Sequence, residues 1–182
     1  DRALQTLGAK RFAQKLGLDP EASARDWVRK LLCCAYQPTE NSGDVTREAA
    51  TAVAEAIGAT FYVLDVQHIV EAYERLIAEA VGRPLTWEQD DITLQNIQAR
   101  ARGPSVWMLA NMRDALLLST SNRSEAAVGY ATMDGDTCGG LSPIAGIDKA
   151  FLRRWLHWLE TEGPVGMRPV PALHAVNIQT PT

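Results

Sequence analysis

Residues Ser119–Lys149 have the sequence STSNRSEAAVGYATMDGDTCGGLSPIAGIDK, and an apolar run, Ala115–Leu118, leads into them. The apolar run predicts a buried strand, and polar residues directly after a parallel strand are typical of a ligand crevice. A helix is expected next, with Glu125 in its first turn. The residues ahead of Glu125 include types that cap helices: Thr120, Ser121, Asn122 and Ser124. The stretch therefore indicates a strand–cap–helix unit, either an ordinary one or one that binds a ligand.

Glu125 has two interpretations from this local chemistry. The amides at a helix N-terminus favour anions, and a carboxylate beside them can hold a magnesium ion that bridges phosphates. A carboxylate in the first turn also stabilises an ordinary helix through the helix dipole, by about 0.3–1 kcal/mol. The local pattern leaves both interpretations open.

Strands alternate with helices outward from this stretch. Apolar, β-branched and aromatic residues predict two further strands, at Leu31–Ala35 and Thr60–Val66. Amphipathic periodicity predicts helices at roughly residues 3–16, 44–57, 69–80, 87–112 (with an interruption at Gly103-Pro104) and 151–159. The alternation predicts an α/β fold, with a mostly parallel sheet and helices on both faces. We expect residues 1–182 to form a single domain, in which the proline-containing residues 163–182 are an extended tail.

The composition limits the class of protein. A hydrophobic content of 46% and a charged content of 22% are those of a globular protein. The formal net charge of −4 argues against a general nucleic-acid binder, which is usually basic. No apolar run is long enough to span a bilayer, and the first residues do not resemble a signal peptide. Three cysteines, two of them adjacent, do not make a disulfide framework. We therefore expect a cytoplasmic protein that does not bind membranes or nucleic acid.

The order of the motifs carries a family resemblance. Thr-Ser-Asn-Arg-Ser-Glu, then Gly-Tyr, Gly-Asp and Ser-Pro-Ile, with a lysine shortly after, resembles the synthetase domain of NAD synthetase. The resemblance is densest from Trp87 to Trp158 and is closer to the glutamine-dependent bacterial branch, because Met133 stands where the short ammonia-dependent branch usually has a lysine. It implies an adenine-nucleotide hydrolase-like, Rossmann-like fold. It also implies that ATP adenylates the nicotinate carboxylate of deamido-NAD, and that ammonia then displaces AMP.

The resemblance implies a magnesium and ATP side of the site. Glu125 matches the glutamate that holds the metal in the family, and Lys149 matches a lysine that contacts ATP phosphates. Thr120, just past the end of the apolar run, and Thr182, the final residue, match ATP-contacting threonines. Magnesium and a lysine suit this step because it builds up and releases phosphate charge. We expect Glu125 and Lys149 to be catalytic residues, together with Asp136.

The resemblance also implies a deamido-NAD side. Asn96 and Arg100 match a family pair that binds the dinucleotide, and on a helix they lie one turn apart on the same face. Tyr130 matches an aromatic residue that stacks on the pyridine ring, although the residue pattern alone predicts a core tyrosine. Asp136 matches the aspartate that recognises the nicotinate end. For Arg102, by contrast, we expect only a surface ion pair.

A loop that follows the first strand is near the adenosine of ATP in the family. Here the corresponding residues would be Gln37, Thr39 and Glu40, although this motif differs between the branches. The family's pyrophosphatase loop, Ser-Gly-Gly-x-Asp-Ser, is absent from this chain, so the resemblance is to a synthetase domain truncated at its N-terminus. Because the glycines of that loop let backbone amides reach the triphosphate, we expect the isolated chain to be inactive.

Two explanations of the missing loop compete, and a third hypothesis concerns the substrate. We favour a fragment of a longer enzyme, in which a glutaminase domain supplies ammonia and the subunits form a homo-oligomer, as in the family. A natural truncation would instead be an inactive module that binds a dinucleotide or pairs with an intact subunit. The third hypothesis is another ligase with a pyrophosphatase loop, which would act on a different acid. Asn96, Arg100 and Tyr130 argue against it, because they favour a pyridine dinucleotide as the substrate.

Overall fold

The structure, a computed structural model, describes residues 2–180, with side chains from residue 5 onward. Two short strands pair in parallel, β1 (Cys33–Tyr36) and β2 (Thr60–Val63), with Cys33 opposite Thr60 and Tyr36 opposite Val63. The helices, in chain order, are α1 (Arg2–Leu7), α2 (Ala9–Lys15), α3 (Ala24–Leu31), α4 (Asp44–Ile57), α5 (Gln67–Val81), α6 (Trp87–Ala101), α7 (Gly103–Met112), α8 (Arg123–Val128), α9 (Lys149–Thr161), the 3-10 helix η1 (Pro171–Leu173) and α10 (His174–Asn177).

The β1–α4–β2 unit forms the centre of the fold. Helix α4 connects the two parallel strands and ends at Gly58, whose φ of 78° is a conformation that glycine adopts without strain. After β2 the chain returns to the exit of β1, where the Val66 amide donates to the carbonyl of Pro38 at 3.1 Å. Side chains from α4, from the N-cap of α5 and from α5 itself are buried here: Ala49, Ala54, Val66 and Val70.

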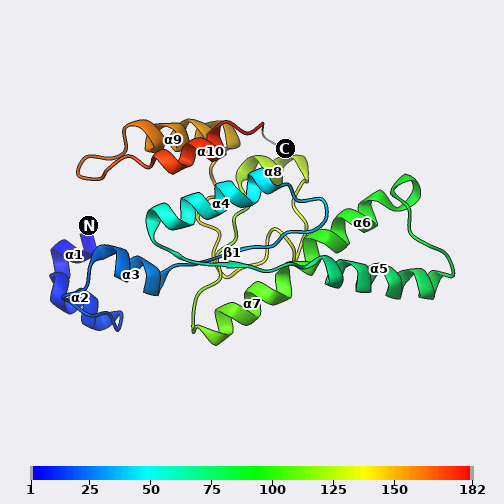
Figure 1. The fold of residues 1–182 in the computed structure, drawn as a ribbon, viewed down its shortest axis with the longest axis horizontal. Helices are drawn as coiled ribbons and strands as arrows, with labels where there is room; N and C mark the ends of the chain where they lie inside the picture. Colours follow the sequence, from blue (N-terminus) through cyan, green and yellow to red (C-terminus); the bar gives the residue numbers. More distant parts are fainter. Residues whose placement is uncertain (1, 181–182) are drawn as a thin grey trace.

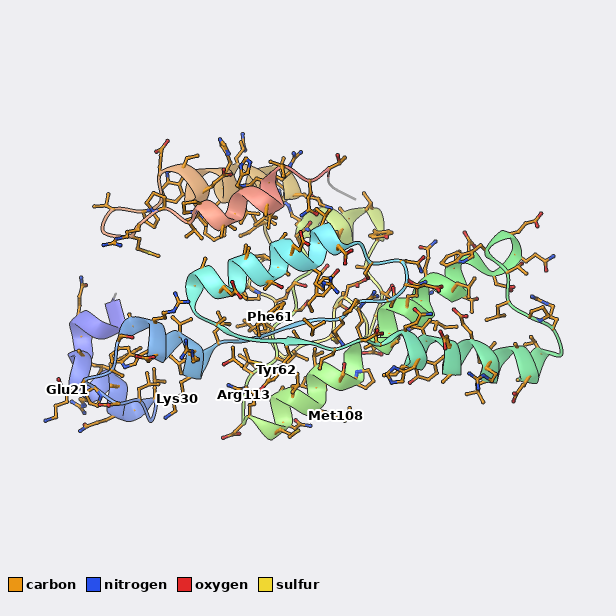
Figure 2. All side chains as sticks on the ribbon, in the orientation of Figure 1. Glu21, Lys30, Phe61, Tyr62, Met108 and Arg113 are labelled. Carbon is orange, nitrogen blue, oxygen red and sulfur yellow. The ribbon has the colours of Figure 1, made fainter. Side chains whose placement is uncertain are left out.

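Helices lie on both faces of the strand pair, as predicted. In Figure 1, α4 runs above the strands and α7 below them. Figure 2 shows Phe61 and Tyr62 of β2 in the zone between these two helices. Helices α5 and α6 form a hairpin that extends away from the strands (Figure 1), and the last turns of α6 return to them. Among the described residues, no helix has both the length and the apolar character that crossing a membrane requires.

The predicted third strand, Ala115–Leu118, does not form in the described residues. It is represented by an isolated parallel bridge between Leu118 and Leu141, and the Ser119 amide donates to the Leu141 carbonyl at 2.8 Å. Leu116 is 63% exposed, so the expected burial is also wrong. A strand is defined by hydrogen bonds to a neighbouring strand, and the hydrogen bonds that join this run to a distant segment within residues 2–180 reach only Gly140 and Leu141, where the Gly140 amide donates to the Leu117 carbonyl at 2.9 Å. The parallel sheet is therefore confirmed but is smaller than expected.

The predicted extended tail is also wrong for residues 171–177. These residues form η1 and α10, which pack against α4 and α9. Leu173 is buried, and the Glu160 carboxylate on α9 accepts from the Asn177 side chain at 2.8 Å and pairs with His174 at 2.8 Å. The hydrogen bond from Asn177, and then that from His174, lower the pKa of Glu160. The prolines of this segment suggested an extended chain, but the buried Leu173 side chain and these polar contacts hold it against α9.

Candidate active site

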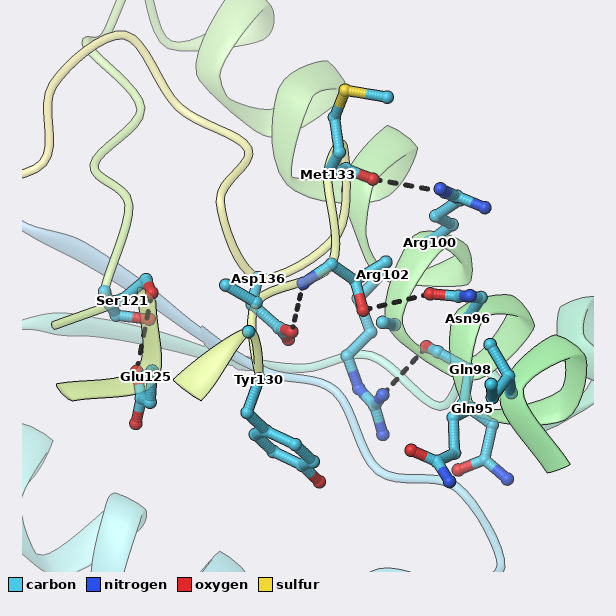
Figure 3. Close-up of a pocket in the computed structure, with 16 residues that line it drawn as sticks. Gln95, Asn96, Gln98, Arg100, Arg102, Ser121, Glu125, Tyr130, Met133 and Asp136 are labelled. Carbon is cyan, nitrogen blue, oxygen red and sulfur yellow. Dashed lines mark hydrogen bonds between the residues drawn. The ribbon is translucent and has the colours of Figure 1, made fainter. Parts of the chain in front are cut away.

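A cavity of about 730 Å³ lies between the second half of α6 and residues 120–136 (Figure 3). Its wall includes six residues that the sequence analysis selected as site residues: Asn96, Arg100, Thr120, Glu125, Tyr130 and Asp136. They come from α6, from α8 and from the loops on either side of α8. Residues far apart in the sequence thus share one concave surface, which is the arrangement that a binding site requires.

Glu125 is held at the start of α8 by a capping box. Asn122 is the N-cap, and its side chain accepts from the amides of Ser124 and Glu125 at 2.9 and 3.2 Å. In return, Oε2 of Glu125 accepts from the Asn122 amide at 3.1 Å and from the Ser121 hydroxyl at 3.4 Å. Glu125 therefore has an ordinary structural role at the start of this helix, and the same side chain also lines the cavity.

Lys149 approaches Glu125 from α9, with 3.6 Å between Nζ and Oε1. It is the first residue of α9, whose N-cap is Asp148, and its amide donates to the Ser124 hydroxyl at 3.0 Å. The Asp148 carboxylate also pairs with Arg123 at 3.1 Å, so the starts of α8 and α9 are tied together. Lys149 is not among the cavity-lining residues and reaches the cavity through Glu125. The other ATP-contacting candidate from the end of the chain, Thr182, lies outside the described residues.

Hydrogen bonds join the side of the cavity that α6 forms, called the α6 wall below, to the loop after α8. The Thr132 hydroxyl donates to Asn96 Oδ1 at 3.2 Å, and Arg100 Nε donates to the Met133 carbonyl at 3.1 Å. Gly135 permits this close approach, because a Cβ at that position would lie 2.9 Å from the Cβ of Ala99. Asn96 and Arg100 do share a face, as their spacing predicted, but both are already bonded to the loop.

Tyr130 and Asp136 are on the loop side of the cavity. Tyr130 is 68% exposed, so it is not the core tyrosine that the residue pattern alone predicted. Its ring faces the open space in Figure 3. Asp136 Oδ2 accepts from the Thr132 amide at 3.3 Å, a bond that closes the turn of its own loop. Thr120 is exposed at the cavity wall, so each of these three residues is accessible to a ligand.

The surface ion pair that the sequence predicted for Arg102 is wrong. It forms no ion pair within the described part of the chain; instead Nε donates to the Gln37 carbonyl at 3.1 Å and Nη1 to the Gln98 carbonyl at 2.8 Å. It also lines the cavity, as do Gln95 and Gln98. The signal in the sequence was the helical spacing, because residues three or four positions apart share a face and the residues at 95, 98 and 102 are all polar.

The loop after β1 contacts the end of α6 at Arg102. The Gln37 side chain donates to the Arg102 carbonyl at 2.9 Å, and the Glu40 amide donates to Gln67 Oε1 at 3.0 Å. Thr39 is buried, and its hydroxyl has no hydrogen-bond partner among the described residues. None of the three lines the cavity, so the loop contributes to this cavity by supporting Arg102.

Cys138 lies near the cavity but is a poor nucleophile. Burial raises the pKa of its thiol, and the nearby Asp136 carboxylate raises it further. The thiolate is the reactive form of cysteine, so both effects suppress reactivity.

Comparison with known proteins identifies the family. The family model described as NAD synthase matches residues 27–172, which is most of the chain. The chain belongs to the NAD synthase family. The cavity, with its wall residues from α6, α8 and the adjoining loops, lies entirely within the matched range.

Individual NAD synthases agree with the resemblance to the glutamine-dependent branch. A crystal structure of a glutamine-dependent NAD(+) synthetase from Cytophaga hutchinsonii is 49% identical, with a TM-score of 0.86, over 97% of this chain and 32% of that one. A glutamine-dependent NAD(+) synthetase from Aquifex aeolicus is 35% identical over 129 residues, and one from Xanthomonas campestris is 33% identical over 132 residues. These stretches cover 71% and 72% of this chain but 22% and 23% of those relatives.

The NAD synthase resemblance implies magnesium, and the cavity offers part of a site for it. No group of three or more His, Cys, Asp or Glu side chains that could hold a metal occurs in residues 2–180. Magnesium at phosphate sites, however, takes one or two carboxylates and completes its shell with substrate oxygens and water. The Glu125 carboxylate fits that role, because it lines the cavity and its Oε1 lies 3.6 Å from the Lys149 ammonium.

Proposed function

We propose that this chain is part of the synthetase domain of a glutamine-dependent NAD synthetase, which converts deamido-NAD to NAD with ATP and ammonia. The observation that supports it is the convergence of six residues, selected through a family resemblance, on one cavity, with Lys149 paired to Glu125 at its edge. The chain spans less than a quarter of the curated relatives cited above. The proposal therefore concerns a part of the complete enzyme.

The first step would join the two substrates. An oxygen of the nicotinate carboxylate attacks the α-phosphorus of ATP, the bond from that phosphorus to pyrophosphate breaks, and the adenylated dinucleotide forms. Lys149 provides a positive charge beside the phosphates, and Thr120 a hydroxyl. When bound, magnesium would neutralise triphosphate charge, and Glu125 is the residue that would hold it. Glu125 is fixed by its capping box, so this carboxylate is already oriented.

The second step would form the amide. Ammonia attacks the activated carbonyl carbon, the bond from that carbon to the AMP oxygen breaks, and a proton leaves the nitrogen. Tyr130 offers an exposed ring on which the pyridine can stack, and Asn96 and Arg100 offer polar contacts for the dinucleotide. Asp136 faces the same cavity. Its charge disfavours an ionised nicotinate beside it, and adenylation removes that unfavourable contact.

The complete enzyme would need further parts. Ammonia would come from a glutaminase domain, and the protein would act in the cytoplasm as a homo-oligomer. The α5–α6 hairpin suits contact with a second copy, because large apolar side chains along it are exposed: Tyr73, Leu76, Ile77, Val81, Trp87 and Ile92. Exposed apolar groups of this kind are typical of association surfaces.

Titration calorimetry of the 182-residue chain with deamido-NAD tests the site. We expect saturable binding that Tyr130→Ala weakens, because the exposed ring would be lost. Val128→Ala, at an exposed position on α8 outside the cavity, is the matched control. Absence of dinucleotide binding to the wild-type chain would contradict the proposal.

Turnover is a separate measurement. We expect no NAD from the isolated chain with deamido-NAD, ATP, magnesium and ammonia, because it has no Ser-Gly-Gly-x-Asp-Ser loop. Detectable amide formation would show that this expectation is wrong. The reading frame upstream of Asp1 distinguishes the alternative of an inactive dinucleotide-binding or subunit-pairing module. A Ser-Gly-Gly-x-Asp-Ser sequence there supports the enzyme, and its absence supports the module.

A further inference from the structure

We propose that Arg102 is an anion-binding residue of the cavity, and that it contacts the pyrophosphate group of the dinucleotide. The identification of the anion as the pyrophosphate of deamido-NAD rests on the proposed function, whereas the anion site itself rests on the geometry of the cavity. Arg102 lines the cavity, is half-buried, and has its guanidinium fixed by two backbone carbonyls. A dinucleotide carries its negative charge mainly on its pyrophosphate, and a guanidinium can bind such a group with two parallel hydrogen bonds.

The two arginines of this wall point in different directions. Figure 3 shows the Arg100 side chain directed to Met133, where Nε donates to the carbonyl at 3.1 Å. The Arg102 guanidinium lies on the opposite side of the wall, with Gln95 and Gln98 beside it and the ring of Tyr130 across the open space. A ligand stacked on Tyr130 would therefore meet Arg102 on the facing side.

The positive charge of Arg102 is not neutralised within the described residues. The guanidinium donates hydrogen bonds to the backbone carbonyls of Gln37 and Gln98, and no carboxylate of the described residues forms an ion pair with it. A carbonyl accepts a hydrogen bond but adds no net charge, and a guanidinium has five N–H groups, of which these bonds use only some. A half-buried cation without a counter-ion is an attractive site for an anion.

Gln37 holds the guanidinium in place before any ligand arrives. Arg102 Nε donates to the Gln37 carbonyl, and Gln37 Nε2 donates back to the Arg102 carbonyl at 2.9 Å and to the Ser105 hydroxyl at 2.5 Å. Ser105 Oγ also contacts the Arg102 carbonyl at 3.2 Å. The loop after β1 therefore orients a cation at the cavity, and a pre-oriented group loses less freedom when a ligand binds.

The test is calorimetric titration of the 182-residue chain with deamido-NAD and, separately, with inorganic pyrophosphate. We expect Arg102→Gln to weaken both affinities about tenfold or more and to reduce their dependence on salt concentration. Arg102→Lys should recover only part of the loss, because an ammonium cannot bind two oxygens in parallel. Arg75→Gln, an exposed arginine on α5 outside the cavity, should leave both affinities unchanged.

The outcomes separate this inference from the proposed function. Wild-type affinity and wild-type salt dependence in Arg102→Gln would overturn the inference, even if deamido-NAD binds well. Pyrophosphate binding that depends on Arg102, without dinucleotide binding, would support the anion site and contradict the proposed function. If Arg102→Gln fails to fold, Gln37→Ala replaces it. This variant keeps the guanidinium and the backbone carbonyl of residue 37 that accepts from it, but it removes the side-chain bonds that hold the loop against the Arg102 carbonyl and the Ser105 hydroxyl. We expect a several-fold weaker affinity; an unchanged affinity would count against the inference.

Discussion

The two ends of the α6 region hold arginines in opposite ways. Just before α6, the Arg83 guanidinium donates to both oxygens of the Asp90 carboxylate, at 2.7 and 2.8 Å. At the far end, Arg100 and Arg102 donate to backbone carbonyls. A carboxylate neutralises the arginine that it fixes, whereas a carbonyl fixes an arginine and leaves its charge in place. The first arrangement shapes a turn, and the second leaves two positive charges at the wall of the cavity.

The Arg83–Asp90 pair has a visible structural role. Asp90 departs from helical geometry, with φ −127° and ψ 24°, and its carboxylate also accepts from the Thr86 amide at 3.0 Å. The hydrogen bond from Arg83, and then that from Thr86, lower the pKa of Asp90 to about 2. The pair thus fixes the turn between α5 and α6, far along the chain from the residues that line the cavity.

Leu94 lies between the two ends of α6 and is the position where a change should cost most. It is 4% exposed, and Leu94→Ala should lower the free energy of unfolding by about 2–5 kcal/mol because a buried cavity replaces the side chain. Urea denaturation followed by circular dichroism measures this loss. Ile92→Ala, at a position 68% exposed, is the control and should cost far less. Equal costs would mean that α6 is not anchored through Leu94.

The contrast between the arginines predicts different effects on binding. Arg100→Gln should weaken deamido-NAD binding about tenfold, which corresponds to about 1.4 kcal/mol, because it removes a cation at the cavity. Arg83→Gln should leave this affinity unchanged and lower the thermal unfolding midpoint instead. Calorimetry and thermal unfolding on the same two variants give both quantities. Weaker binding in Arg83→Gln would remove the distinction between the two ends.

The contribution of Asp90 to stability should depend on pH. Its folded-state pKa of about 2 lies below the ordinary value of 3.8, so the ionised form is favoured by folding. The stabilisation is therefore fully present above pH 3.8 and is lost as the pH falls through 2. The difference in unfolding midpoint between wild type and Asp90→Asn should be constant near neutral pH and shrink in acid. A difference for Asp90→Asn that persists in acid would contradict the assignment.

Local patterns predicted much of this arrangement. The two strands and the amphipathic helices have short-range signatures, such as the β-branched run that became β2 and the glycine that ends α4. The convergence of Glu125, Tyr130 and Arg100 on one cavity followed from matching motif order to a family, because a family's motifs encode distances that no single helix or strand shows.

Features that depend on distant partners were not predictable. The run Ala115–Leu118 has the composition of a strand, yet a strand exists only when a neighbour offers its hydrogen-bonding edge. The sequence around Arg102 is that of an ordinary surface arginine, because the residue that holds it, Gln37, is remote in sequence. The segment around Leu173 contains prolines that suggest an extended chain, but its docking depends on α4 and α9.

The capping box at α8 has a consequence for how a ligand is received. Folding alone immobilises the Glu125 side chain, because Oε2 accepts from the Asn122 amide while Oε1 stays near Lys149. A free glutamate side chain carries up to about 1.5–2 kcal/mol of rotamer entropy. Folding has therefore already restricted this side chain, and a ligand that bound the carboxylate would have less of that entropy to remove.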